Sequence, residues 1–191
     1  MVNKTEHNIE NLIKQQVKQQ VIDEGGSSNI SQCAKVMLAS ANFGKANPDD
    51  LVNAGIAAEF FFQALHRHYS KGKGKGTDVI MGDYFGAVAI VFSNKIEDSE
   101  ILKTFCKAIQ EATKDKDDEY KESGRLAKIY GASAWVGAYL AGLTGDALSD
   151  FRLMGEKTGL RILRAIDLEG YKQALVKFSK SNDFIKNVGL N

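Results

Sequence analysis

The residues best suited to bind a ligand are basic. His66, Arg67 and His68 follow one another, and Arg125 lies in a later segment. Clustered cations of this kind could hold a diphosphate through charge-assisted hydrogen bonds. A simpler interpretation is a solvated helix end, where basic side chains lie near the negative pole of the helix. We favour the helix end and retain the four residues as candidate diphosphate ligands.

Carboxylates could bind a metal ion, but their spacing here is unfavourable. Asp167 and Glu169 are two residues apart, so on a helix their side chains point about 200° apart and cannot clamp one ion together. The acidic run at residues 115–119 is preceded by Lys114 and interrupted by Lys116, which favours a solvated connection between helices. The spacing of these carboxylates therefore predicts no metal site.

The composition is that of one soluble globular domain of 191 residues, with 43% hydrophobic and 26% charged residues. The 25 basic and 24 acidic residues leave a net charge of +1, which favours neither nucleic acid nor an anionic membrane. The N-terminus is polar and no apolar run approaches the ~20 residues of a membrane span, so we expect a cytoplasmic protein. Cys33 and Cys106 lack the spacing of a zinc site and are expected to be buried free thiols.

Apolar residues recur with the period of a helix along nearly the whole chain, and no segment shows the alternation of a strand. Asn47 is the expected N-cap of the third helix, with Pro48 in its first turn. The expected helices cover residues 6–24, 30–41, 51–69, 78–93, 99–113, 124–143, 146–167 and 171–178. The sequence thus predicts an all-α bundle of eight or nine helices in a single domain over residues 1–191.

Aromatic residues gather on two of these helices. Phe60, Phe61 and Phe62 are consecutive, so their rings face around more than half of the helix. Core packing is their simplest role, but we expect at least one ring to reach a cavity or an interface. Trp135 lies on the helix at 124–143, whose small residues allow close approach of helix backbones, and it is expected in the core or at an interface. The lysine-rich segment 71–75 is expected to be a solvated loop.

Three short motifs follow one another along the chain. They are Met81-Gly82-Asp83-Tyr84, then Gly124-Arg125-Leu126-Ala127 with the small-residue run 136–142, then the stretch 155–160 that leads to Asp167. Their order and spacing resemble the trans-isoprenyl diphosphate synthase (polyprenyl synthetase) family over roughly residues 20–170. The resemblance implies an isoprenoid-synthase-like helical fold, in which the Gly82-Asp83-Tyr84 motif mainly serves helix packing.

The chain departs from that family at each chemical position. The family holds Mg²⁺ between two aspartate clusters on facing helices and binds a second diphosphate through basic residues after an N-terminal Gly-Gly. Here Ser27-Ser28 follows Gly25-Gly26, and His66-Arg67-His68 replaces the first aspartate cluster. Arg125 replaces the lysine of a Lys-Thr motif, and Asp167 is a degenerate remnant of the second cluster.

These departures imply a short degenerate member of the family that does not catalyse prenyl transfer alone. We expect the non-catalytic small subunit of a heteromeric prenyl diphosphate synthase in isoprenoid biosynthesis, which supports the catalytic subunit and its product chain length. The catalytic subunit would carry the Mg²⁺ and form a heterodimer or heterotetramer with this chain, which needs no cofactor. One alternative is a divergent prenyltransferase or terpenoid enzyme that acts on allylic diphosphates with Asp167, Glu169 and a further cluster that the sequence does not reveal. The other is a homodimeric helical protein that binds an isoprenoid.

Overall fold

The computed structural model describes residues 4–22, 32–69, 76–114 and 121–163, which form seven helices and no strand. The helices are α1 (Lys4–Ile22), α2 (Cys33–Ala41), α3 (Pro48–Tyr69), α4 (Gly76–Asn94), α5 (Ser99–Lys114), α6 (Lys121–Leu140) and α7 (Asp146–Leu163). The predicted all-α class is confirmed, and the count in the described residues is close to the expected eight or nine. The expected helix at 171–178 lies outside the described residues.

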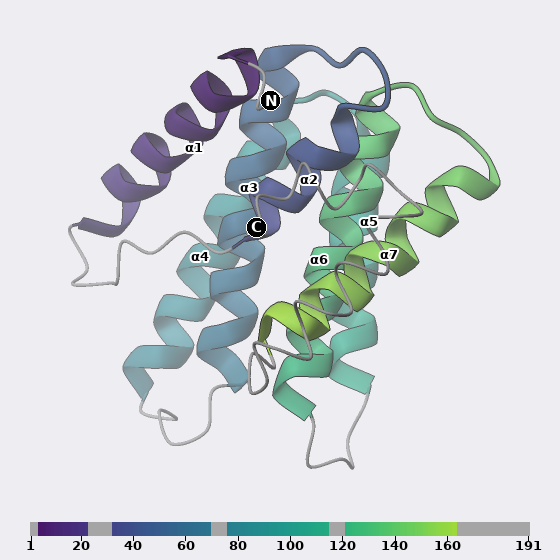
Figure 1. Cartoon of the computed structure of the whole chain (residues 1–191). Coiled ribbons are helices and arrows are strands. Elements are labelled where there is room, and N and C mark those ends of the chain that lie inside the picture. Colours follow the sequence, from purple (N-terminus) through teal and green to yellow (C-terminus); the bar gives the residue numbers. More distant parts are fainter. Residues whose placement is uncertain (1–3, 23–31, 70–75, 115–120, 164–191) are drawn as a thin grey trace.

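Two long helices, α3 and α6, form the centre of the bundle. α3 contacts α1, α2, α4, α5 and α6, while α6 also contacts α2, α5 and α7. In Figure 1, α3, α4, α5 and α6 run side by side, α1 lies along one flank, and α7 crosses α6 at an angle. The apolar stripes of the helices meet in one core that includes Phe60, Phe85 and Phe105. Since successive helices alternate in direction, α3 ends at the same end of the bundle where α4 and α6 begin (Figure 1).

The third helix begins as the sequence predicts. Asn47 Oδ1 accepts a hydrogen bond from the Asp49 N–H at 2.9 Å, and Pro48 is the first residue of α3. A capping oxygen satisfies an N–H group that has no partner within the helix, while proline has no such group to satisfy. The local signals of the sequence are therefore sufficient to start this helix.

The start of α2, in contrast, is capped from a distant part of the chain. Gln32, which precedes the helix, makes no side-chain capping bond. Instead, the fully buried Glu59 of α3 accepts a hydrogen bond from the Ala34 N–H at 2.9 Å. A buried carboxylate is costly unless it is satisfied, and a helix N-terminus offers both N–H donors and the positive end of the dipole. Burial, with Cys33 and Glu59 close by, raises the pKa of the neighbouring Tyr130 phenol of α6.

Small residues allow α6 to approach α2 and α7 closely. A methyl group at Gly137 of α6 would overlap the backbone oxygen of Met37 in α2. On the other side, a methyl group at Gly155 of α7 would lie 2.6 Å from the Tyr130 carbonyl oxygen, and one at Gly159 would lie 2.6 Å from the Tyr130 ring. Real side chains do not tolerate such distances, so glycine is required at each of these helix contacts.

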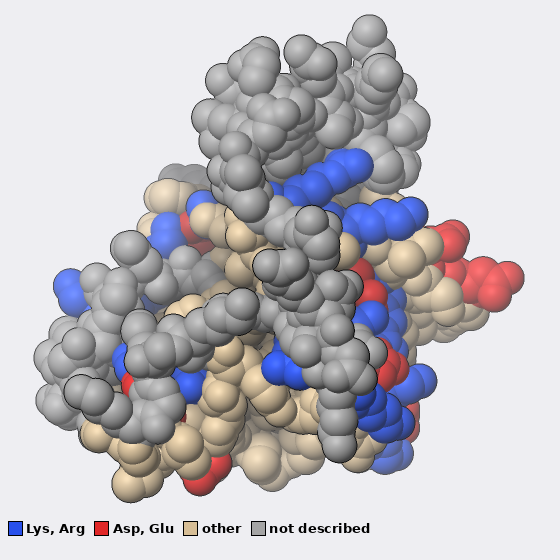
Figure 2. All heavy atoms as spheres, turned by 90° about the horizontal axis from the view of Figure 1, so that it is seen from below, with Lys and Arg blue, Asp and Glu red and all other residues tan. Residues whose placement is uncertain are grey.

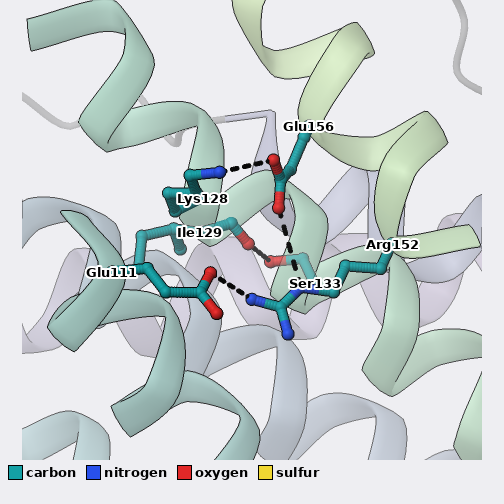
Figure 3. A network of polar contacts seen from close by, with 6 residues as sticks. All are labelled: Glu111, Lys128, Ile129, Ser133, Arg152 and Glu156. Atoms are coloured by element: carbon teal, nitrogen blue, oxygen red, sulfur yellow. Dashed lines mark hydrogen bonds and ion pairs between the residues drawn. The ribbon is translucent and has the colours of Figure 1, made fainter. Parts of the chain in front are cut away.

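An ion-pair network ties α7 to α5 and α6 (Figure 3). Arg152 Nη2 of α7 lies 2.6 Å from Glu111 Oε2 of α5, and Lys128 Nζ of α6 lies 2.8 Å from Glu156 Oε2 of α7. Arg152 Nε is also 3.6 Å from Glu156 Oε1, so the four charges form a continuous chain. Partial burial reduces the screening of these pairs by salt. The sequence analysis did not single out this network.

Cys106 and α4 differ from the expectations, whereas Cys33 agrees with them. Cys33 is buried, but Cys106 is exposed on α5. Its neighbour Phe105 faces the core, and adjacent residues of a helix point about 100° apart, so residue 106 turns toward solvent.

By length and composition alone, α4 could cross a membrane, whereas the sequence analysis expected no such segment. Because one side of α4 packs along α3, this property alone is weak evidence for a membrane span.

The distant cap on α2 predicts a large stability loss on truncation of Glu59. In Glu59→Ala, the Ala34 N–H loses its acceptor and a cavity remains, so the free energy of unfolding should fall by about 3 kcal/mol in urea denaturation. Glu100→Ala removes an exposed carboxylate that bonds to Lys103 within α5, and it should cost less than about 1 kcal/mol. Equal losses for the two variants would show that Glu59 does not hold α2.

The glycine contacts predict opposite effects at two helical positions. Gly155→Ala should lower the free energy of unfolding by about 1–3 kcal/mol, because the methyl group meets the backbone of α6. Gly124→Ala should raise it by about 0.5–1 kcal/mol, because nothing lies within 4 Å of the added methyl group and alanine favours a helix. Thermal and urea unfolding would measure both, and a stable Gly155→Ala variant would contradict the close α6–α7 contact.

Candidate functional site

The basic residues predicted from the sequence lie in the last turn of α3, next to the start of α4. The two helices pack together, and Figure 1 shows the end of α3 and the start of α4 at one end of the bundle. α4 carries Asp78 in its first turn and Asp83 further along. The helix pairing therefore places two carboxylates beside the basic cluster.

Arg67 pairs with the first acidic residue of α4. Its Nη1 atom donates to Asp78 Oδ1 at 3.0 Å, and the two side chains are only 25% and 16% exposed. Asp78 is also favoured by its place in the first turn of α4, at the positive end of the helix dipole. The guanidinium of Arg67 is thus held by a partly shielded partner eleven residues further along the chain.

His68 pairs with Asp83 of the Gly82-Asp83-Tyr84 motif. His68 Nε2 lies 3.2 Å from Asp83 Oδ1, and Asp83 itself remains 73% exposed. A methyl group at Gly82 would lie 2.7 Å from His68 Nε2, so a side chain at this position would displace the imidazole. In this chain the motif accommodates and binds a side chain from the end of α3, which agrees with the helix-packing role that the resemblance implied.

The other two candidate ligands rest on aromatic rings. The Arg125 guanidinium of α6 lies 4.4 Å from the centre of the Tyr69 ring, a cation–π arrangement. The His66 ring stacks on Phe62 one turn earlier in α3, with ring centres 6.0 Å apart and an angle of 11°. The structure therefore gathers the four predicted residues around the last turn of α3, although three elements contribute to their contacts.

The surface at this end carries charges of both signs. Figure 2 looks at the molecule from below, and basic and acidic side chains are interspersed over the described part of that face. The sequence analysis did not single out Asp78. A basic last turn of one helix followed by an acidic first turn of the next could have indicated this pair. Among the described residues, Arg67 and His68 at the junction between α3 and α4 each face a carboxylate of α4.

The described residues hold no group of three or more His, Cys, Asp or Glu side chains that could bind a metal ion. The carboxylates that contact the α3 end, Asp78 and Asp83, each face a basic partner. Asp167 and Glu169, the lysine-rich segment 71–75 and the stretch 25–28 lie outside the described residues. Their predicted roles stay predictions.

The three consecutive phenylalanines lie in the core. Phe60 packs against Phe85 of α4 with ring centres 5.6 Å apart, and Phe61 stacks on Phe105 of α5 at 5.0 Å. Phe62 meets the Tyr130 ring of α6 edge-on at 5.8 Å. Each ring has a ring partner from a different helix, which is how three adjacent residues can all be buried.

Trp135 lies between core and surface. Its ring stacks on Tyr139, one turn later in α6, with ring centres 4.8 Å apart. The Tyr139 hydroxyl donates to Asp98 Oδ2 at 2.9 Å, and this bond raises the pKa of the phenol. Trp135 thus packs at the partly exposed edge of the core, as part of an aromatic pair that is tied to the start of α5.

No protein-family model matches the sequence, and no curated protein matches it significantly. Solved structures do match. A geranyltranstransferase from Methanosarcina mazei superposes with a TM-score of 0.63 and 17% identity, over 98% of this chain and 83% of that chain. An isoprenoid synthase family member from Thermotoga neapolitana superposes with a TM-score of 0.57 and 16% identity, over 97% and 87%. The chain therefore has the fold of the isoprenoid synthases.

Proposed function

We propose that this chain is a non-catalytic subunit of a heteromeric prenyl diphosphate synthase in the cytoplasm. The observation that supports this most directly lies at the end of α3, where Arg67 and His68 contact Asp78 and Asp83 of α4. The fold of the isoprenoid synthases is present, but the residues at this position differ in kind from those that prenyl transfer needs.

Prenyl transfer in the family that the sequence resembles starts with the departure of an allylic diphosphate, which carboxylate-bound Mg²⁺ stabilises. The residues at the α3 end do not fit such an ion. Arg67 is permanently positive and would repel Mg²⁺, and the carboxylate of Asp78 is held by that guanidinium. Removing Asp78 from Arg67 to bind a metal would leave a partly buried arginine without its partner.

The aromatic core supports a role exercised through a partner. Phe60, Phe61 and Phe62 fill the space between α3 and its neighbours with ring contacts. A growing prenyl chain would have to displace these rings, at a large cost in packing. We therefore assign any influence on product chain length to contact with a catalytic subunit, in a heterodimer or heterotetramer, and the Mg²⁺ to that subunit.

The second candidate is a divergent prenyltransferase or terpenoid enzyme. The favouring observation is the structural likeness to a geranyltranstransferase, which extends over 98% of this chain. His66, Arg67, His68 and Arg125 would then bind the diphosphate, and this chain would release it from an allylic substrate without a partner. The two candidates differ in whether the purified chain turns over by itself.

The subunit role predicts inactivity alone and an effect in a mixture. The purified chain should release no diphosphate from C10 to C20 allylic diphosphates with isopentenyl diphosphate and Mg²⁺. Mixed with the full-length synthase of the same cells, it should co-elute in size-exclusion chromatography and shift the product lengths measured by mass spectrometry. The synthase alone, at the same concentration, is the control.

Two outcomes would decide against the subunit role. Turnover by the chain alone that is lost in Arg125→Ala and kept in Lys103→Ala, an exposed lysine of α5, would establish the enzyme alternative. If the chain and the synthase elute separately and the product lengths are unchanged, the proposed heteromeric complex is excluded.

The junction between α3 and α4 also predicts how the chain binds inorganic diphosphate. In Asp78→Asn/Asp83→Asn, Arg67 and His68 lose their carboxylate partners and become available to an anion. The affinity measured by calorimetry should rise roughly five-fold per pair, since an exposed or partly exposed ion pair is worth about 1 kcal/mol. Asp146→Asn/Asp150→Asn makes the same change in net charge at the start of α7 and should leave the affinity unchanged. An equal rise in diphosphate affinity in both double variants would indicate an effect of net charge and would contradict a specific role of the two pairs.

A further inference from the structure

The first helix, α1, is attached to the bundle along one narrow stripe. Among its described side chains, at residues 7–20, only Ile9, Ile13 and Val17 are buried, and they follow one another at intervals of four residues. Side chains at this interval lie on one face of a helix. The helix packs on α3 and touches α2 beside it, and Figure 1 shows it on the flank of the bundle. We call the surface of α2 and α3 that this stripe covers the α1 seat.

The α1 seat has a recess that fits the middle side chain of the stripe. A methyl group at Gly55 of α3 would overlap the end of the Ile13 side chain and would lie 3.3 Å from the Met37 Cε atom of α2. Ile13 is fully buried and occupies the space that a side chain at residue 55 would take. Amphipathic helices that bind in the groove of another protein anchor themselves in the same way, through apolar residues on successive turns.

In the part of the chain that the structure describes, the polar contacts from α1 to α2 and α4 are long. Lys35 Nζ of α2 lies 3.8 Å from Glu10 Oε1, which also pairs with Lys14 within α1. The Tyr84 hydroxyl of α4 lies 3.4 Å from Gln20 Oε1 at an exposed position. Both distances are near the upper limit for their kind of contact, and pairs that are open to water contribute little to stability. The apolar stripe therefore provides most of the attachment of α1.

By itself, the sequence of α1 favours a helix only weakly. Residues 4–22 contain no alanine and include several isoleucines and valines, which lower the helix propensity. An isolated helix of this length and composition is marginal in water, so α1 depends on its seat for order. The contacts among α2 to α7, including those of the central helices α3 and α6, do not involve α1. A segment held in this way opens at a lower free energy than the whole fold.

We infer that the α1 seat is a helix-binding surface and that α1 is its internal ligand, which leaves and returns while the rest of the bundle stays folded. In its seated position α1 is an autoinhibitory contact, because it keeps other helices from the seat. A partner that fits the seat is an amphipathic helix with branched apolar residues at i, i+4 and i+8 and an acidic residue after the first of them, opposite Lys35. The inference concerns α1 alone and does not depend on the proposed function.

Hydrogen exchange of the full native chain, followed by mass spectrometry, tests whether α1 opens by itself. Its amides should exchange at least about 100-fold faster than those of α3 and α6, because a local opening is sufficient to expose them. Ile13→Asp should remove the remaining protection of α1 and leave α3 and α6 protected. Leu12→Asp is the matched control, because it makes the same change at the adjacent residue, which is 49% exposed, and it should exchange like the native chain. Equal exchange rates in α1, α3 and α6, or unfolding of the whole chain by Ile13→Asp, would overturn the inference.

A synthetic peptide with the sequence of residues 4–22 tests whether the seat accepts a helix from outside. In fluorescence anisotropy, the labelled peptide should bind the Ile13→Asp chain, whose seat is vacated. It should bind the native chain at least about ten-fold more weakly, since the tethered α1 competes at a high effective concentration. A peptide with Ile13→Asp should not bind, whereas a peptide with Leu12→Asp should bind like the unaltered one. Equal binding of the two altered peptides, or no binding of the unaltered peptide to the Ile13→Asp chain, would show that the seat is not a helix-binding surface.

Discussion

Much of this fold depends on how closely α6 approaches its neighbours. Glycine at 137 lets the backbone of α6 lie against α2, and glycines at 155 and 159 let α7 cross over Tyr130. At such short distances dispersion contacts are dense, and no larger side chain can be accommodated without moving a helix. Tyr130 stands at the intersection, because its ring meets Phe62 of α3 while its hydroxyl end lies near Cys33 and Glu59. The positions of α2, α3 and α7 are thus set relative to one central helix.

The pairing of α3 with α4 determines the chemical character of the candidate site. Because the two helices run antiparallel, the basic end of α3 meets the acidic start of α4, and Arg67 and His68 each contact a carboxylate within the chain. A cluster that would attract diphosphate in isolation is instead part of a helix junction. The same contact involves Gly82, since the His68 imidazole occupies the space that a side chain at residue 82 would take. The contacts of Arg67 with Asp78 and of His68 with Asp83 thus join the end of α3 to α4.

α4 also connects the interior of the molecule with its surface. Its inner side completes the core around Phe60, whereas its outer side leaves Ile80 and Val91 in water. Burial of apolar area is worth roughly 25 cal/mol per Å², so an exposed apolar face gains stability when a second protein covers it. The packing of α4 within the chain therefore accounts for the apolar residues on its inner side only.

By itself, the sequence determined the helical class, most helix boundaries, the close-packing role of the small residues on α6 and the absence of carboxylates at His66-Arg67-His68. These features depend on local periodicity, capping and composition, which a single segment carries within itself. Only the tertiary structure decided that Phe60, Phe61 and Phe62 are all buried, that Glu59 caps α2, and that Asp78 and Asp83 neutralise the end of α3. Each of these outcomes depends on a partner from another helix, and the choice of partner follows from how the helices pack. For the same reason, the exposure of Ile80 and Val91 on α4 could not be predicted, since an apolar helix has the same sequence pattern whether one side or both sides are covered.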